Sequence, residues 1–179
     1  MFFHSLTLAA SNKLNVKMED IYLDKPIEIE NIRENLSELF TDLEVFYWDF
    51  VDEEPSNFNS ENSNQIFFNT IFDEDRKEFA FVISIYRTPD ENSYERQLFL
   101  AEYFSKKHKI RTLAPYIHPE KPNYPYYDII FTENNAFLAD DSDTSFGDGT
   151  ENLIEIIQRI EIPVIKFDTK ANLMNETSS

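Results

Sequence analysis

Two apolar runs joined by one short polar turn constrain this chain more than any other feature. The runs QIFFNTIF (65–72) and FAFVISIYR (79–87) are rich in aromatic and β-branched residues, which favour strands. Only DEDRKE lies between them, and a connection this short favours antiparallel pairing. The second run is apolar on both faces, which is typical of a central strand. We therefore expect a sheet built around this pair.

Helical periodicity appears in three other segments. Residues 27–40 and 92–109 carry apolar side chains at three- and four-residue steps. Residues 150–160 repeat the pattern behind Asp148 and Glu151, which are spaced like a capping box. These patterns predict an α+β fold, with about three helices packed on a mainly antiparallel sheet. Further strands are expected near residues 17–23, 43–51, 111–117, 127–131, 136–140 and 162–168.

The length of 179 residues fits one domain with tails. Residues 1–17 are expected to form an N-terminal strand or a loose arm, because their apolar stretch is short, interrupted by polar residues and not preceded by Lys or Arg. Residues 18–168 should form a single α+β domain, and residues 169–179 a flexible C-terminal tail. No apolar run approaches the roughly 20 residues that span a membrane.

The charge of the chain is strongly negative, since 34 acidic residues face 16 basic ones and give a net charge of −18. Such a surface repels nucleic acid and anionic lipid, whose recognition depends on Lys and Arg. It favours a basic protein partner, or it serves solubility alone. Cysteine is absent, which excludes disulfides and thiol chemistry and fits a cytoplasmic location.

The segment ADDSDTSFGDGTEN (139–152) holds both glycines of the chain but does not match a calcium loop. An EF-hand loop starting at Asp141 would need glycine where Phe146 stands and glutamate where Asn152 stands. The three histidines are far apart, and none has a second metal-type residue at ligand spacing. We therefore expect no catalytic residue, no metal site and no cofactor.

Acidic loops and a tyrosine-rich, proline-stiffened loop are instead candidates for a partner-binding surface. Tyrosine gives a large contact area at low entropic cost, and proline limits the cost of ordering the loop. An alternative is that these tyrosines only cover the edge of the sheet. The candidate partner-binding residues are Asp52, Glu53, Glu54, Tyr124, Tyr126, Asp140, Asp141 and Asp143.

Residues 79–141, from FAFVISIYRT through ENSYERQLFLAEYFSKKHKIRTLAPYI to YYDIIFTENNAFLADD, resemble small bacterial immunity proteins. These belong to toxin–immunity systems, including those of contact-dependent inhibition. The resemblance lies in a central strand, a helix that ends in lysines and a strand pair with acidic tips. It implies a non-enzymatic inhibitor that binds a cognate toxin domain, often a basic nuclease, and it assigns no particular residue.

Three functions therefore stay open at this point. The first is an acidic immunity protein that neutralises a basic toxin domain and is not an enzyme. The second is a nucleic-acid mimic that blocks a restriction or defence enzyme, which would need carboxylates spaced like phosphates. The third is an enzyme or a small-molecule-binding domain that uses His118 or the aspartate-rich loop. A deep pocket that contains those groups would favour the third.

Overall fold

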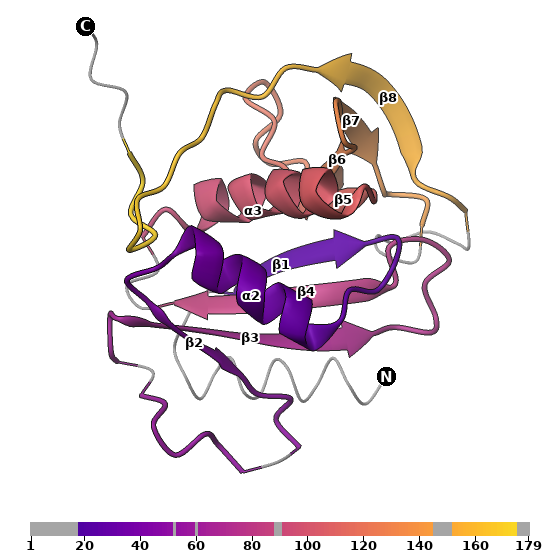
Figure 1. The fold of residues 1–179 in the computed structure, drawn as a ribbon. Coiled ribbons are helices and arrows are strands. Elements are labelled where there is room, and N and C mark those ends of the chain that lie inside the picture. The colour runs from indigo at the N-terminus through magenta and orange to yellow at the C-terminus, as the bar shows by residue number, and fades with distance from the viewer. Residues whose placement is uncertain (1–17, 52, 60, 88–90, 145–151, 175–179) are drawn as a thin grey trace, which may run out of the picture.

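The fold is α+β, with one eight-stranded mixed sheet in the order β2-β3-β4-β1-β5-β6-β7-β8 (Figure 1). The computed structural model describes residues 18–51, 53–59, 61–87, 91–144 and 152–174. Along the chain the elements are β1 (Met18–Leu23), α2 (Ile29–Leu39), β2 (Glu44–Tyr47), β3 (Gln65–Phe72), β4 (Phe81–Arg87), α3 (Ser93–His108), β5 (Thr112–Pro115), β6 (Tyr127–Phe131), β7 (Ala136–Asp140) and β8 (Glu155–Ile160).

The predicted arrangement of about three helices on a mainly antiparallel sheet is wrong. The sheet is mixed, because β2 runs parallel to β3 while the other neighbouring pairs are antiparallel. A parallel pair needs a connection of a dozen or more residues, and residues 48–64 provide one. Two helices, α2 and α3, occur in the described residues.

The third predicted helix, at residues 150–160, is wrong, because Glu155–Ile160 within this segment forms the edge strand β8. Its isoleucines are β-branched and favour strands, and the free edge of β7 offers backbone partners. The apolar side chains do not form a buried stripe, since Leu153, Ile156 and Ile157 are 62%, 51% and 44% exposed. The expected capping pair, Asp148 and Glu151, lies outside the described residues.

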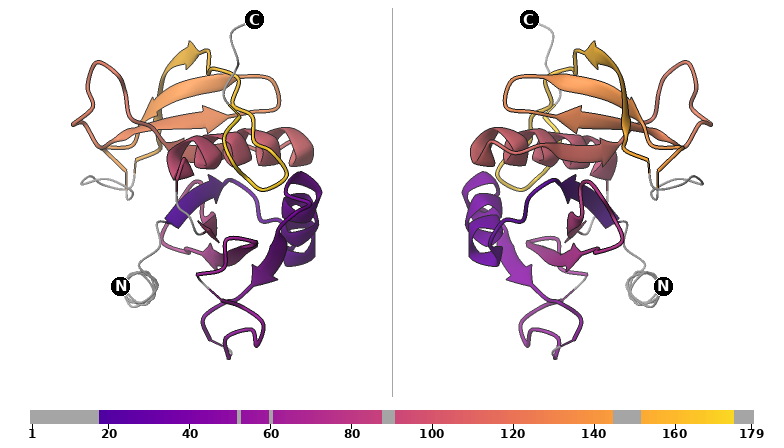
Figure 2. Two further views of the ribbon diagram at one scale, coloured as in Figure 1. Left: turned by 90° about the vertical axis from the view of Figure 1, so that its left-hand side faces the viewer. Right: turned by 90° about the vertical axis from the view of Figure 1, so that its right-hand side faces the viewer.

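The helices predicted at 27–40 and 92–109 are confirmed as α2 and α3. Both lie on the same face of the sheet, and the sheet curls around α3, with β1 to β4 on one side and β6 to β8 on the other (Figure 2). Their apolar stripes form the main core, in which Ile32, Leu36 and Phe104 are fully buried. Within the described ranges, neither helix has the length and apolar character needed to cross a membrane.

The segment after β8 returns across α3 and closes the core on that side (Figure 2). Residues 162–168, predicted as a strand, pair only through an isolated bridge between Phe167 and Leu173. The ring centroid of Phe167 lies 5.3 Å from that of Phe99 on α3. Residues 169–174, expected to begin a flexible tail, form a turn in which Ala171 is 1% exposed. The expected arm at 1–17 and residues 175–179 lie outside the described residues.

Candidate functional site

The loop at residues 116–126 folds back over the ends of β6 and β7. Its first residue, Tyr116, donates its backbone N–H to the carbonyl of Tyr127 at 2.8 Å. The backbone N–H of Asp141 donates to the carbonyl of Tyr126 at 3.0 Å, and Tyr127 faces Asp140 across the β6–β7 ladder. These bonds bring the tyrosines of the loop to the aspartates that end β7. We call this region the tyrosine–aspartate end; it comprises Lys121, Tyr124, Tyr126, Tyr127, Asp128, Asp140 and Asp141.

Tyr124 and Asp140 form the central contact at the surface of this end. The Tyr124 hydroxyl donates to Asp140 Oδ2 at 2.8 Å, and the backbone N–H of Ser142 donates to Asp140 Oδ1 at 2.9 Å. Burial alone would raise the pKa of the Asp140 carboxyl, but the hydrogen bonds from Ser142 and Tyr124 outweigh it and hold that pKa below its ordinary value. Asp140 is therefore a fixed carboxylate at the rim of the loop.

The aromatic rings of the tyrosine–aspartate end pack against one another. The ring centroid of Tyr124 lies 4.7 Å from that of Tyr127 and 5.3 Å from that of Tyr126. Lys121 donates through Nζ to the Tyr127 hydroxyl at 2.9 Å and lies 5.5 Å from the Tyr127 ring centroid. Tyr124 and Tyr126 remain half-buried, so part of each ring is open to a partner.

Two buried carboxyl groups, those of Asp128 and Asp141, lie beneath this surface. Asp128 pairs with Ala139 across the ladder, so Asp141, two residues later, lies on the same face. The two residues are 5% and 9% exposed. Their carboxyl groups are within hydrogen-bonding reach of each other, while Asp128 Oδ2 and Asp141 Oδ1 receive no donor from the described residues. A proton retained on one carboxyl group would let that group donate a hydrogen bond to the other.

Burial and neighbouring negative charges raise the pKa values of both carboxyl groups. Burial, followed by the charges of Asp141 and Asp140, raises the pKa of Asp128 well above its ordinary value. Burial and the charge of Asp140 raise the pKa of Asp141 to about 6, although Asp128 and the nearby Arg76 act in the opposite direction. Perturbed carboxyl groups of this kind gather at functional sites more often than elsewhere.

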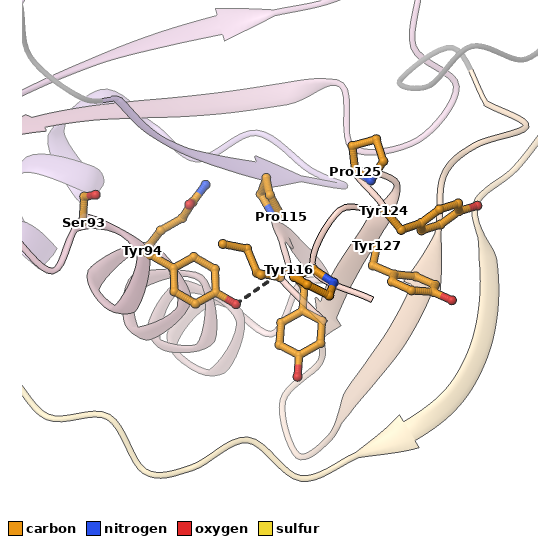
Figure 3. A pocket seen from close by; sticks show the side chains of 10 residues that line it. Ser93, Tyr94, Pro115, Tyr116, Tyr124, Pro125 and Tyr127 are labelled. Carbon is orange, nitrogen blue, oxygen red and sulfur yellow. Dashed lines mark hydrogen bonds between the residues drawn. The ribbon is translucent and has the colours of Figure 1, made fainter. Parts of the chain in front are cut away.

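A pocket of about 250 Å³ opens beside the tyrosine–aspartate end, between the first turn of α3 and the loop 116–126. The rings of Tyr94 and Tyr116 lie on one side of it, and those of Tyr124 and Tyr127 lie together on the other (Figure 3). The Tyr94 hydroxyl accepts a hydrogen bond from the backbone N–H of Ile117 at 3.2 Å. None of the ten described lining residues is charged.

The structure brings together four of the eight residues expected at a partner surface, namely Tyr124, Tyr126, Asp140 and Asp141. Asp143 follows closely and is exposed. Glu53 and Glu54 are also exposed, but they follow β2 at the opposite edge of the sheet (Figure 1). The two acidic loops therefore do not flank one surface. Asp52 lies outside the described residues.

The sequence interpretation missed Tyr94, Tyr116 and Asp128. Tyr94 appeared only as part of a helical stripe, and nothing in the sequence places a helix N-terminus beside a loop more than 20 residues later. Asp128 carried a signal, because an aspartate inside the apolar run YYDIIF is unusual for a buried strand. The sequence alone did not reveal the role of Asp128, because Asp141 comes near it only through the β6–β7 register.

The described residues offer little for metal-dependent or histidine-based chemistry. No group of three or more His, Asp or Glu side chains among them is arranged to hold a metal ion. His108 bonds to Asn35 across the two helices, with 2.6 Å between His108 Nε2 and Asn35 Nδ2. The described lining of the pocket includes neither His118 nor any aspartate, so the pocket does not favour an active site built on those groups.

The tyrosine–aspartate end is thus an arrangement suited to binding, with ordered rings at the surface and carboxylates around them. Its rings can stack on planar or apolar groups, and its carboxylates can accept hydrogen bonds from cations. Comparison of the sequence with models of protein families and with curated proteins, and of the structure with solved structures, gave no significant match.

Proposed function

We propose that this protein is a cytoplasmic, non-enzymatic inhibitor that binds a basic protein through its tyrosine–aspartate end. The observation that carries the proposal is the hydrogen bond between Tyr124 and Asp140, which fixes an aromatic ring and a carboxylate side by side at an open surface. Tyrosine is enriched among the residues that dominate binding energy, and carboxylates steer a basic partner into contact.

The charge of this region supports a basic partner. Residues 116–144 contain six acidic side chains, of which Glu120, Glu133 and Asp143 are exposed, and one Lys or Arg side chain, Lys121. Lys121 is itself bonded to Tyr127, so its charge is partly satisfied within the protein. Exposed carboxylates of this kind speed the association of a basic protein and make it sensitive to salt.

The order of the loop supports tight binding. Turns that end at Lys121 and Tyr124 are closed by backbone hydrogen bonds of 3.0 and 3.1 Å. The prolines of the loop restrict its backbone further. A loop that is ordered before binding loses less conformational entropy when the complex forms. This property suits an inhibitor that must hold its target for a long time.

The resemblance of residues 79–141 to bacterial immunity proteins suggests the class of partner, a cognate toxin domain encoded by a neighbouring gene. The direct test is to co-express the protein with that toxin and to measure both survival and co-purification. We expect protection and a stable complex. Failure to protect against any neighbouring toxin would contradict the proposal.

Binding kinetics locate the surface. Asp143→Lys should slow association several-fold at low salt, and less at high salt, because the charge acts within a Debye length of about 8 Å. Glu54→Lys is the matched control, since it makes the same charge change on an exposed side chain at the opposite edge of the sheet. Equal effects of the two variants would place the contact surface elsewhere.

A further inference from the structure

We propose that the pocket between the first turn of α3 and the loop 116–126 receives an arginine side chain of the basic partner. This inference rests on the proposed function, because the partner presents the arginine. It adds a specific anchor to a surface so far described only by its charge and its tyrosines. The pocket can nevertheless be tested by itself, with a small probe and without the partner.

The size of the pocket suits one side chain. Its volume of about 250 Å³ lies below the roughly 300–1,000 Å³ of sites that enclose drug-sized ligands. Its lining consists mainly of tyrosine, proline and isoleucine, which can cover the aliphatic stem of a long side chain. An arginine stem would lie against Pro115, Ile117 and the prolines of the loop.

The tyrosine rings of the lining supply the recognition. The hydroxyls of three of them are already engaged: that of Tyr94 with the backbone of Ile117, that of Tyr124 with Asp140, and that of Tyr127 with Lys121. Tyr127 is buried against Tyr124, so the half-buried rings of Tyr94, Tyr116 and Tyr124 provide the remaining contact surface. Ring faces attract cations, and arginine stacks on them more often than lysine because its guanidinium is planar and less strongly hydrated.

The charges near the pocket favour a cation. None of the described lining residues is charged, so a guanidinium meets no positive side chain inside. Asp140 is joined to a lining ring through the 2.8 Å bond from Tyr124, and Glu95 lies in the first turn of α3, where it offsets the positive end of the helix dipole. Lys121 acts in the opposite direction, but its Nζ is held at the Tyr127 hydroxyl, at the edge of that ring rather than over its face.

The test is an NMR titration of the isotope-labelled full chain with N-acetyl-arginine methylamide, compared with the citrulline analogue, which has nearly the same shape but no charge. We expect saturable shifts at Tyr94, Tyr116 and Ile117 in the millimolar range. Binding of the citrulline probe should be about threefold weaker or more. Equal binding of both probes, or preference for an acetylated proline peptide, would overturn the assignment of an arginine.

Two variants separate the pocket from the rest of the surface. Tyr116→Ala should abolish the saturable shifts, because it removes one wall of the pocket. Asp143→Asn should leave the probe titration unchanged, since Asp143 is exposed and lies outside the described lining. The same Asp143→Asn variant should slow association of the partner. If the partner binds but the probe does not, only the assignment of the pocket is wrong. If the probe binds but no basic partner does, only the proposed function is wrong.

Discussion

Arg96 on α3 and Glu19 on β1 form an ion pair that is closed to solvent, with side chains 0% and 1% exposed. Arg96 Nε donates to Glu19 Oε2 at 3.0 Å, and Nη2 donates to the other carboxylate oxygen. The same guanidinium donates to the carbonyls of Glu91 and Ala171 at 3.1 and 3.4 Å. The pair thus joins the middle of the sheet, the start of α3 and the turn at the C-terminal end of the domain.

Removing one member of this ion pair should strongly destabilise the fold. Arg96→Met leaves the Glu19 carboxylate buried without its bidentate guanidinium and should lower the free energy of unfolding by about 3–5 kcal/mol in urea denaturation. The double variant Glu19→Leu, Arg96→Met should lose less than the single variant, because neither member of the pair is then left buried opposite an apolar side chain. Arg33→Met, which breaks an exposed pair with Glu30, serves as control and should cost below about 1 kcal/mol. Additive losses in the double variant would refute this account.

The carboxyl pair of Asp128 and Asp141 should destabilise the fold as the pH rises. The folded pKa of Asp141 is raised to about 6, above the roughly 3.9 of an unfolded chain. Its stabilising contribution is therefore complete below the unfolded pKa and is lost as the pH rises through about 6. Asp141→Asn keeps a hydrogen bond to Asp128 without the charge.

We expect Asp141→Asn to unfold at higher urea than the parent at pH 8, and the advantage to shrink at pH 4. Asp143→Asn is the control, because Asp143 is exposed and should show no such trend. An advantage that is larger at pH 4 than at pH 8 would contradict a shared proton. The burial of Asp128 and Asp141 makes this comparison sensitive to the pair itself.

Lys109 ends α3 in a conformation that glycine would adopt more easily. Its φ and ψ are 55° and 44°, and its backbone N–H bonds to the carbonyl of Ser105. This geometry destabilises a residue that has a Cβ by roughly 1–2 kcal/mol. Glycine avoids that cost, but it loses more conformational entropy on folding, which offsets part of the gain. Lys109→Gly should therefore stabilise the protein by about 0.5–1 kcal/mol in thermal unfolding. The lost pair with Glu133, at 3.9 Å and exposed, contributes little.

The matched control is Lys106→Gly, one turn earlier in the same helix. Lys106 has helical geometry, so glycine there should destabilise by about 1 kcal/mol. Opposite signs for the two glycine variants would support the left-handed end of α3. A loss of stability at both positions would contradict it.

The sequence correctly predicted those elements in which the periodicity of the apolar side chains sets the face that packs against the core. The stripes of α2 and α3 and the strand at 65–72 are of this kind, because one face of each meets the core. Elements whose state depends on a distant neighbour were not predictable in this way. The segment at 150–160 carries isoleucines at helical spacing, yet Glu155–Ile160 forms β8, because β7 has a free edge beside it. The parallel pairing of β2 with β3 likewise follows from where the chain returns, which no local pattern specifies.

The same distinction applies to the candidate site. The sequence identified Tyr124, Tyr126 and the aspartates of β7, because tyrosines in a proline-rich loop and carboxylates in a row are visible in composition. Its candidates also included Glu53 and Glu54, which the strand order places beside β2, at the opposite edge of the sheet. The pocket was not predictable, since its walls come from α3 and from the loop before β6.

Tyr124→Phe tests the contact that fixes the tyrosine–aspartate end. The variant keeps the ring but removes the donor to Asp140, so the pKa of the Asp140 carboxyl should rise toward its ordinary value. Because the folded pKa of Asp140 is lowered in the parent, its contribution to stability is present above the unfolded pKa and is lost as the pH falls through the folded pKa. The variant should therefore cost about 0.5–1.5 kcal/mol at pH 7 and less near pH 3. A carbon-detected NMR titration of Asp140, with urea denaturation at both pH values, measures the two effects. Tyr47→Phe, at the opposite edge of the sheet, is the control and should leave the Asp140 titration unchanged. If Asp140 in the Tyr124→Phe variant titrates as in the parent, this hydrogen bond does not hold the carboxylate.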